Sequence, residues 1–174
     1  MDELISAAMK LKRILDRHGI GFIVVGSLAD YLLGLDSVRP RDIDLLVSHN
    51  DAEKIISVAR EESGVRIVSP MEYREGDNIR GLYGRILVDT VSVDILANVE
   101  LRYRGEWLFI TYENLIPCTI EVTLTDEIPV RLPCLEIQAV ADEALGRVER
   151  ARVLKKLATR LTCGKELCQL NITS

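Results

Sequence analysis

The segment from Asp42 to Val47 constrains the fold most, because it places two acidic side chains inside a run of strand-forming residues. Alternate side chains of a strand lie on the same face, so Asp42 and Asp44 are predicted to project together while Ile43 enters a core. Two carboxylates about 7 Å apart on one strand repel each other unless a cation lies between them. Magnesium is the natural match, since a few carboxylates and substrate phosphates are its usual ligands.

A third acid, Asp94, lies within the apolar segment 91–96. Alternation turns Asp94 to the face opposite the β-branched residues around it. An acid is disfavoured inside such a strand, and a metal site shared with Asp42 and Asp44 on a neighbouring strand explains its presence. Asp89 is the competing acid, but it lies at a predicted turn between two strands, where aspartate is common.

Gly26 and Ser27 follow a short apolar run, residues 22–25, that is typical of a buried strand. A helix is predicted from residue 28 to residue 33, and Ser27 with Asp30 three residues later has the spacing of a capping box. The N-terminus of a helix favours anions, a glycine permits close approach of the backbone, and a serine hydroxyl donates to phosphate oxygens. The pair is therefore a candidate phosphate site, and a plain helix cap is the alternative for Ser27.

Arg39 and Arg41 come directly before the acidic pair. Guanidinium groups at this place would offset further phosphate charge. We therefore predict Gly26, Ser27, Arg39 and Arg41 as nucleotide-binding residues. The alternative for the two arginines is an ordinary role as charged surface residues.

The order of the predicted elements indicates an α+β domain with a mixed sheet flanked by helices. Two parts are expected, a core over residues 1–134 and a C-terminal helical segment over residues 135–174 that packs on the same domain. Residues 70–81 are polar and are predicted to form a loop. The predicted helices are 2–18, 28–33, 52–62, 135–145 and 148–161, and the predicted strands are 22–25, 42–47, 65–68, 82–88, 91–96, 107–111, 119–124 and 130–132.

The composition narrows the classes of partner and compartment. The net charge of −5 over 174 residues argues against a broad basic footprint for duplex nucleic acid. The longest apolar runs are too short to cross a bilayer, and the first residues lack the basic and apolar regions of a signal peptide. We therefore expect a cytoplasmic protein. Abundant charged residues and scarce Asn and Gln weakly favour a thermophilic source.

The four cysteines are Cys118, Cys134, Cys163 and Cys168. Their spacing does not match that of a zinc site, and no histidine lies near them. Buried or half-buried thiols are the favoured interpretation. A disulfide is the next alternative, and metal binding is the third.

The apolar strand before Gly26-Ser27, the helix after it, Asp42-Ile43-Asp44-Leu45-Leu46-Val47 and the later strand with Asp94 together resemble the DNA-polymerase-β-like nucleotidyltransferase superfamily. Within that superfamily, Ala29-Asp30-Tyr31-Leu32 and Arg39-Pro40-Arg41-Asp42-Ile43-Asp44 are similar to the small nucleotidyltransferases of prokaryotes, including the abortive-infection toxin type. The resemblance covers residues 22–96 well and extends weakly over residues 135–147.

The resemblance implies a nucleotidyltransferase-like fold and the transfer of a nucleoside monophosphate from a nucleoside triphosphate, such as ATP, to an acceptor hydroxyl. Asp42 and Asp44 would hold two Mg²⁺ ions, or Mn²⁺, together with the triphosphate. Asp94 would complete the catalytic metal site and help to activate the acceptor. Gly26 and Ser27 would bind the β- and γ-phosphates. The acceptor, whether RNA, protein or small molecule, is left open, and a second copy or a partner subunit is one source of the surface that recognises it.

Two departures from the resemblance leave other functions open. Such relatives often carry a lysine where Asp142 stands, and Glu149-Arg150 replaces a further Lys-Asp pair. Arg147 or Arg150 is the candidate substitute for the missing cation. The alternatives are a catalytically silent nucleotide-binding module and an interaction subunit of the toxin–antitoxin type. A glycosyltransferase with an Asp-x-Asp manganese site is a more distant possibility.

Overall fold

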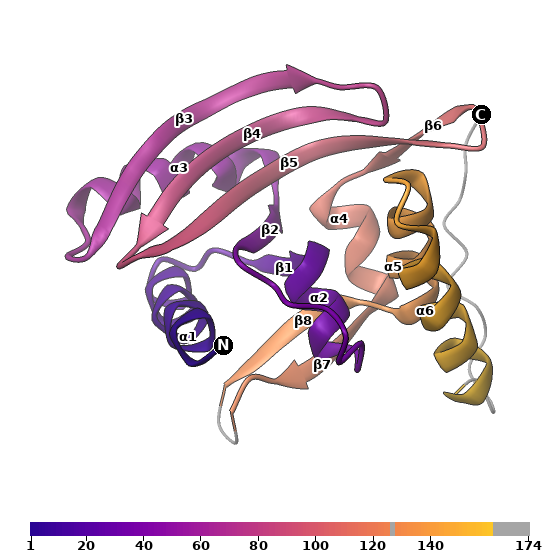
Figure 1. The fold of residues 1–174 in the computed structure, drawn as a ribbon. Coiled ribbons are helices and arrows are strands. Elements are labelled where there is room, and N and C mark those ends of the chain that lie inside the picture. The colour runs from indigo at the N-terminus through magenta and orange to yellow at the C-terminus, as the bar shows by residue number, and fades with distance from the viewer. Residues whose placement is uncertain (126–127, 162–174) are drawn as a thin grey trace.

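The computed structural model describes residues 1–125 and 128–161, and it confirms an α+β fold built on a mixed sheet (Figure 1). The strand order is β1-β2-β5-β4-β3, and β6 pairs with the second half of β5. Strand β2 runs parallel to β5, whereas all the other pairs are antiparallel. The strands of this sheet are β1 (Phe22–Val25), β2 (Ile43–Val47), β3 (Val65–Glu75), β4 (Ile79–Val88), β5 (Val91–Tyr103) and β6 (Glu106–Ile110).

Side-chain alternation divides the residues of β2 and β5 between the two faces of the sheet. Leu45 and Ile95 belong to one core cluster together with helices α1 (Asp2–Arg17) and α3 (His49–Glu61). Leu46 and Leu96 belong to a second cluster with residues of helix α5 (Leu135–Ala144). Asp44 and Asp94 lie two residues before Leu46 and Leu96, so they project from the same face of the sheet, the one that α5 covers.

The C-terminal helices α5 and α6 (Val148–Leu161) pack on each other, and α5 contacts β5 and the short helix α2 (Gly26–Leu32). In Figure 1 they stand at the β6 end of the sheet, away from α1 and α3. Strands β7 (Thr119–Thr123) and β8 (Pro129–Pro133) form a separate hairpin that contacts β1 through β8. The face of the sheet that carries Asp44 and Asp94 is thus bounded by helices that follow the sheet in sequence.

The predicted loop over residues 70–81 is wrong, because most of it belongs to the long hairpin of β3 and β4. Strand β3 is an edge strand in which half-buried residues alternate with exposed ones as far as Glu72, and residues 72–75 are all exposed. Pro70 is tolerated there because an edge strand can lack a ladder hydrogen bond, and the register shifts between Ser69 and Glu72. The strand was predicted only over residues 65–68, because the polar composition after them hid its second half.

Two helix starts also differ from prediction. Helix α2 begins at Gly26 rather than residue 28, and the Ser27 side chain does not cap it. Helix α3 is capped by Ser48, whose hydroxyl accepts a hydrogen bond from the Asp51 amide at 3.1 Å, instead of by Asn50 or Asp51. At only seven residues, α2 contributes little dipole field, so the phosphate-binding argument has to rest on Gly26 itself.

A short helical segment between β6 and β7 was not predicted. It comprises α4 (Tyr112–Leu115) and the 3₁₀ helix η1 (Ile116–Cys118). Thr111 and Asn114 form a reciprocal capping box at its start. That Thr-x-x-Asn spacing was the available signal, although Asn is a less common partner in this motif than Glu or Gln.

No helix in the described part of the chain is long and apolar enough to cross a membrane. Cys118 is buried and Cys134 is half-buried, as expected for thiols that pack in a core. Cys163 and Cys168 lie outside the described residues.

Candidate active site

Asp44 and Asp94 occupy directly paired positions on the parallel strands β2 and β5. Their side chains therefore project from the same face of the sheet, and both line one cavity. Asp42 lies one residue before the start of β2, and its charge acts on Asp44. The structure thus brings the three predicted acids into one electrostatic group, although only Asp44 and Asp94 line the cavity.

Gly26 lies directly against the Asp44 carboxylate. Val25, the last residue of β1, pairs with Asp44, so the chain turns into α2 beside this side chain. Gly26 has a φ of +67°, and a Cβ at this position would overlap the carboxylate of Asp44. The positive φ and the contact with Asp44 each require glycine here, and the absence of a side chain lets the backbone lie close to the acids.

The environment of Asp44 disfavours its charged form. Burial, followed by the negative charges of Asp42 and Asp94, raises the pKa of Asp44 to about 7. The nearby charges of Arg147 and Arg85 act in the opposite direction. A carboxylate held among other carboxylates in this way gains most from a bound cation.

Arg85 already neutralises part of this charge. It lies opposite Asp94 in the β4–β5 register, and its Nε and Nη2 atoms donate to the two oxygens of Asp94 at 2.5 and 2.8 Å. Such a two-point contact is the strongest geometry available to an arginine and a carboxylate. The Arg85 side chain is 44% exposed, so it has room to move away from Asp94.

Within the described ranges, no three His, Cys, Asp or Glu side chains are arranged closely enough to enclose a metal ion. The donor chemistry nevertheless fits a hard divalent cation, because Asp42 and Asp44 offer carboxylate oxygens. The raised pKa of Asp44 reflects negative charge around it that such a cation would neutralise. Asp94 joins such a site only when its contact with Arg85 is loosened. Asp94 is thus paired with Asp44 across the strands but held by Arg85, whereas Asp42 lies before the strand and outside the cavity lining.

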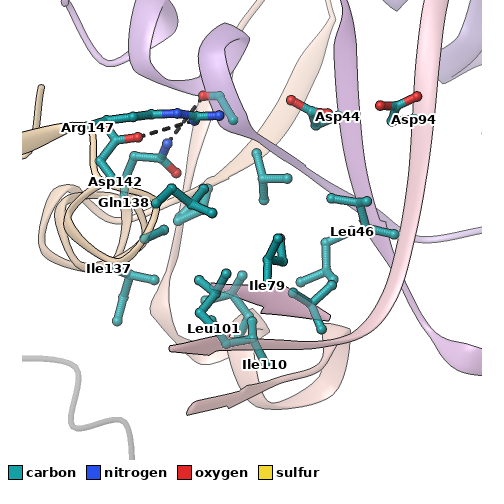
Figure 2. Close-up of a pocket in the computed structure, with 18 of the residues that line it drawn as sticks. Asp44, Leu46, Ile79, Asp94, Leu101, Ile110, Ile137, Gln138, Asp142 and Arg147 are labelled. Carbon is teal, nitrogen blue, oxygen red and sulfur yellow. Dashed lines mark hydrogen bonds and ion pairs between the residues drawn. The ribbon is translucent and has the colours of Figure 1, made fainter. Parts of the chain in front are cut away.

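The cavity beside the acids has a volume of ≈260 Å³ and lies between the sheet and α5. Figure 2 shows Asp44 and Asp94 next to each other on one side and Gln138, Asp142 and Arg147 on the other. Aliphatic side chains fill the space between and below these two groups. They include Leu46, Leu96, Val99, Leu101, Ile110 and Ile137.

A buried polar cluster joins α2 to α5 and α6 on the far side of the cavity. Asp30 is fully buried, and its oxygens accept from Gln138 Nε2 at 2.7 Å and Arg150 Nη1 at 3.1 Å. The same Gln138 nitrogen donates to the Gly26 carbonyl at 3.2 Å, which ties the cluster to the glycine beside Asp44. Asp30 therefore has a structural role, and the predicted capping box is wrong.

Asp142 is the second buried acid of this cluster. Its Oδ1 accepts from Arg147 Nη1 at 3.4 Å, and its Oδ2 has no hydrogen-bond partner among the described residues. Burial and the charge of Asp30 raise the pKa of Asp142. Of the two candidate substitutes for a missing cation, Arg150 contacts Asp30, whereas Arg147 lines the cavity and acts on Asp44.

The remaining predicted residues lie outside the cavity. Ser27 is half-buried in the first turn of α2 and does not line it. Arg39 donates to the carbonyls of Asp36 and Val38, and Arg41 is exposed before β2. The structure therefore gathers Gly26 with the acids but does not gather the two arginines with them.

Sequence reasoning missed Arg85 and Tyr83 as residues of the site. Both lie on β4, and their alternation places them on the face that carries Asp94. The Tyr83 hydroxyl is buried and has no hydrogen-bond partner among the described residues. The signal for both was the register of a hairpin, which a single sequence does not reveal.

The fold is that of nucleotidyltransferases. TM1012 of Thermotoga maritima, a provisionally assigned nucleotidyltransferase, superposes with a TM-score of 0.71 at 24% identity over 92% of this chain and 95% of that one. The antibiotic-resistance factor ANT(2'')-Ia gives a TM-score of 0.51 at 17% identity, over 91% and 92% of the two chains. A second ANT(2'')-Ia structure, in complex with adenylyl-2''-tobramycin, gives 0.49 at 16% identity, over 90% and 97%. No family model and no curated protein sequence matches this chain.

Proposed function

We propose that this protein transfers a nucleoside monophosphate from a nucleoside triphosphate to an acceptor hydroxyl. The observation that carries the proposal is the convergence of Asp44, Asp94 and Gly26 in the lining of one cavity. The likeness of the fold to TM1012 supports the same class of reaction. Because that likeness concerns the fold, the assignment of chemistry rests on the residues of the site.

The acids have separate tasks in this reaction. Asp42 and Asp44 would hold Mg²⁺, or Mn²⁺, together with the triphosphate. A metal bound there would supply positive charge that lowers the pKa of the attacking hydroxyl and stabilises the leaving pyrophosphate. Asp94 accepts the proton of the acceptor hydroxyl. The hydroxyl oxygen then forms a bond to the α-phosphorus, and the bond from that phosphorus to the pyrophosphate oxygen breaks.

The triphosphate lies along the polar rim of the cavity. Gly26 presents its backbone without a side chain beside Asp44, and Ser27 in the next position supplies a hydroxyl. Arg147 lies between α5 and α6, lines the cavity, and its positive charge acts on Asp44. It takes the place of the lysine expected from the family resemblance. Arg39 and Arg41 do not line the cavity, so their part is only to offset phosphate charge outside it.

The test is nucleotidyl transfer from an α-labelled triphosphate in the presence of Mg²⁺ and a panel of acceptors that includes RNA, the protein itself and small alcohols. Asp44→Asn is expected to reduce transfer by about a thousandfold or more, since it removes a metal-binding charge. Asp36→Asn, an exposed acid in the preceding loop, is the matched control and is expected to leave transfer unchanged. Transfer that survives Asp44→Asn would overturn the proposal.

A catalytically silent nucleotide-binding module is the second candidate function. The specific observation in its favour is the contact of both Asp94 oxygens with Arg85, which withholds the third acid from a metal. This alternative predicts metal-dependent binding of a triphosphate with no release of pyrophosphate. Calorimetry combined with a pyrophosphate assay separates the two functions.

A further inference from the structure

The cavity next to Asp44 and Asp94 has a mostly aliphatic lining, which does not suit the phosphates of a nucleotide. A triphosphate is highly charged, and its phosphates belong beside the metal and the polar groups of the rim. The interior of the cavity is instead lined by aliphatic side chains from β2, β5, β6 and α5, including Leu46, Leu101 and Ile137. Another part of the reaction complex must occupy that space.

Two side chains that line the cavity carry a buried polar atom without a partner among the described residues, Asp142 on the α5 wall and Tyr83 on β4. The Tyr83 hydroxyl is buried and has no hydrogen-bond partner among the described residues. The charges of Asp44 and Asp94 both act on it, which places it at the carboxylate end of the cavity. A buried hydroxyl without a partner costs stability, so a ligand group that hydrogen-bonds to it gains affinity.

We infer that this cavity is the acceptor site and that the acceptor is a compact, uncharged, largely apolar alcohol whose hydroxyl is held by Tyr83 beside Asp44 and Asp94. The inference rests on the proposed function, since it names the substrate class of the same site. Tyr83 is a positioning residue in this arrangement, because it orients the hydroxyl whose proton Asp94 accepts.

The size and the charge of the cavity exclude other classes of acceptor. Its ≈260 Å³ lies just below the roughly 300–1,000 Å³ typical of sites for drug-sized ligands, so it suits a single ring or a short branched chain. A polycation such as tobramycin would have to bury several ammonium groups in a space lined mainly by aliphatic side chains, which is costly. Asp142, the acid on the opposite wall, faces Arg147 through Oδ1 and keeps Oδ2 without a partner among the described residues, so one cationic group is the most that this wall could pair.

The experiment uses ligand-observed NMR with benzyl alcohol as the probe, the full chain and no nucleotide. Benzyl alcohol is expected to bind to the wild-type protein at millimolar concentration. Ala141→Leu, which extends a side chain from α5 into the cavity, is expected to abolish that binding. Val140→Leu, at the half-buried neighbouring position that does not line the cavity, is the matched control and is expected to retain it.

Competition experiments test whether another class of ligand occupies the cavity. Displacement of benzyl alcohol by adenosine would show that the nucleoside occupies the cavity, and displacement by tobramycin would show a polycation site. Either result overturns the inference, as does binding that survives Ala141→Leu. Since no triphosphate is present, loss of nucleotidyl transfer would contradict the proposed function without affecting this result.

Tyr83→Phe provides a second variant that does not depend on filling the cavity. It is expected to raise the KM for an alcohol acceptor about three- to tenfold, as for the loss of one hydrogen bond, while the KM for the triphosphate stays unchanged. The melting temperature is expected to stay the same or rise, because the hydroxyl has no partner in the described structure. An unchanged acceptor KM would contradict the role given to Tyr83.

Discussion

Two pairs of acids lie near arginines in this molecule, and their surroundings differ. Asp44 and Asp94, the open pair, project from the sheet and line the cavity, whereas Asp30 and Asp142, the buried pair, lie between α2, α5 and α6, with only Asp142 reaching the opposite wall of the cavity. Asp30 is matched to hydrogen-bond donors, but Asp44 faces two other acids. The contacts of Asp30 stabilise the fold, whereas the surroundings of Asp44 cost stability that a bound cation would restore.

The two pairs are also physically connected. Gln138 donates one hydrogen bond to Asp30 and another to the Gly26 carbonyl, and Gly26 lies against Asp44. The buried pair therefore holds in place the backbone on which the open pair depends. Variants that separate stability from binding test this division of roles.

The largest effect on stability is expected for Asp30→Ala. The change leaves Arg150 and Gln138 without their buried acceptor. Loss of one partner of a buried ion pair costs about 3–5 kcal/mol, and we expect a decrease of this size in the free energy of unfolding by urea. Asp36→Ala, at an exposed position, is the control. A decrease below about 1 kcal/mol would contradict the structural role of Asp30.

Asp44→Asn is expected to have the opposite sign in the metal-free protein. The raised pKa means that folded Asp44 binds a proton more tightly than unfolded Asp44, so stability falls as the pH rises from about 4 to about 7. Asparagine removes this loss and should stabilise the protein by on the order of 4 kcal/mol above pH 7, with no gain below pH 4. Unfolding by guanidinium across this pH range measures it, and a gain that is independent of pH would contradict the assignment.

Arg147→Gln and Arg150→Gln are expected to separate binding from stability. Arg147 faces the cavity, so its loss should weaken triphosphate binding about tenfold, as for one charge-assisted hydrogen bond. Arg150 contacts Asp30 instead, so its loss should lower stability by about 1–3 kcal/mol and leave the affinity nearly unchanged. Calorimetric titration and thermal unfolding of both variants measure the two quantities. A similar loss of affinity in both would refute the distinction.

The smallest effect is expected for Arg85→Gln. The Arg85 side chain is 44% exposed, so its contact with Asp94 contributes less than about 1 kcal/mol to stability. Its removal frees the Asp94 carboxylate, and we expect Mn²⁺ without nucleotide to bind a few-fold more tightly. Electron paramagnetic resonance of free Mn²⁺ measures this affinity. Weaker binding in the variant would mean that Arg85 does not compete with the metal.

The open pair of acids could be predicted from the sequence, whereas the buried pair could not. Strand alternation turned Asp44 and Asp94 away from the buried residues of their own strands, because period-two patterns are local, and the predicted metal site placed the two strands side by side. The pairing of Asp44 with Asp94 in the β2–β5 register confirms that they share one face. The contact of Asp30 with Gln138 and Arg150 joins residues more than 100 positions apart, and no local pattern encodes it. The sequence therefore indicated the acids of the site but not the residues that support them.

The fold was predictable to a similar extent. Buried strands and amphipathic helices were found because their apolar periodicity is strong, as in α1 and β2. The edge strand β3 was predicted only over residues 65–68, because its later residues are mostly polar and residues 72–75 are exposed on both faces. Arg85 and Tyr83 were missed for a related reason, since their positions depend on how β4 pairs with β5.

The central claim is that Asp44 and its neighbours form a metal-dependent triphosphate site. The most direct measurement is calorimetric titration of a nonhydrolysable nucleoside triphosphate into the wild-type protein, Asp44→Asn and Asp36→Asn, each with and without Mn²⁺. We expect Mn²⁺-dependent binding to the wild-type protein and to Asp36→Asn, and none to Asp44→Asn. Equal binding to all three proteins, or binding that does not require Mn²⁺, would contradict the account.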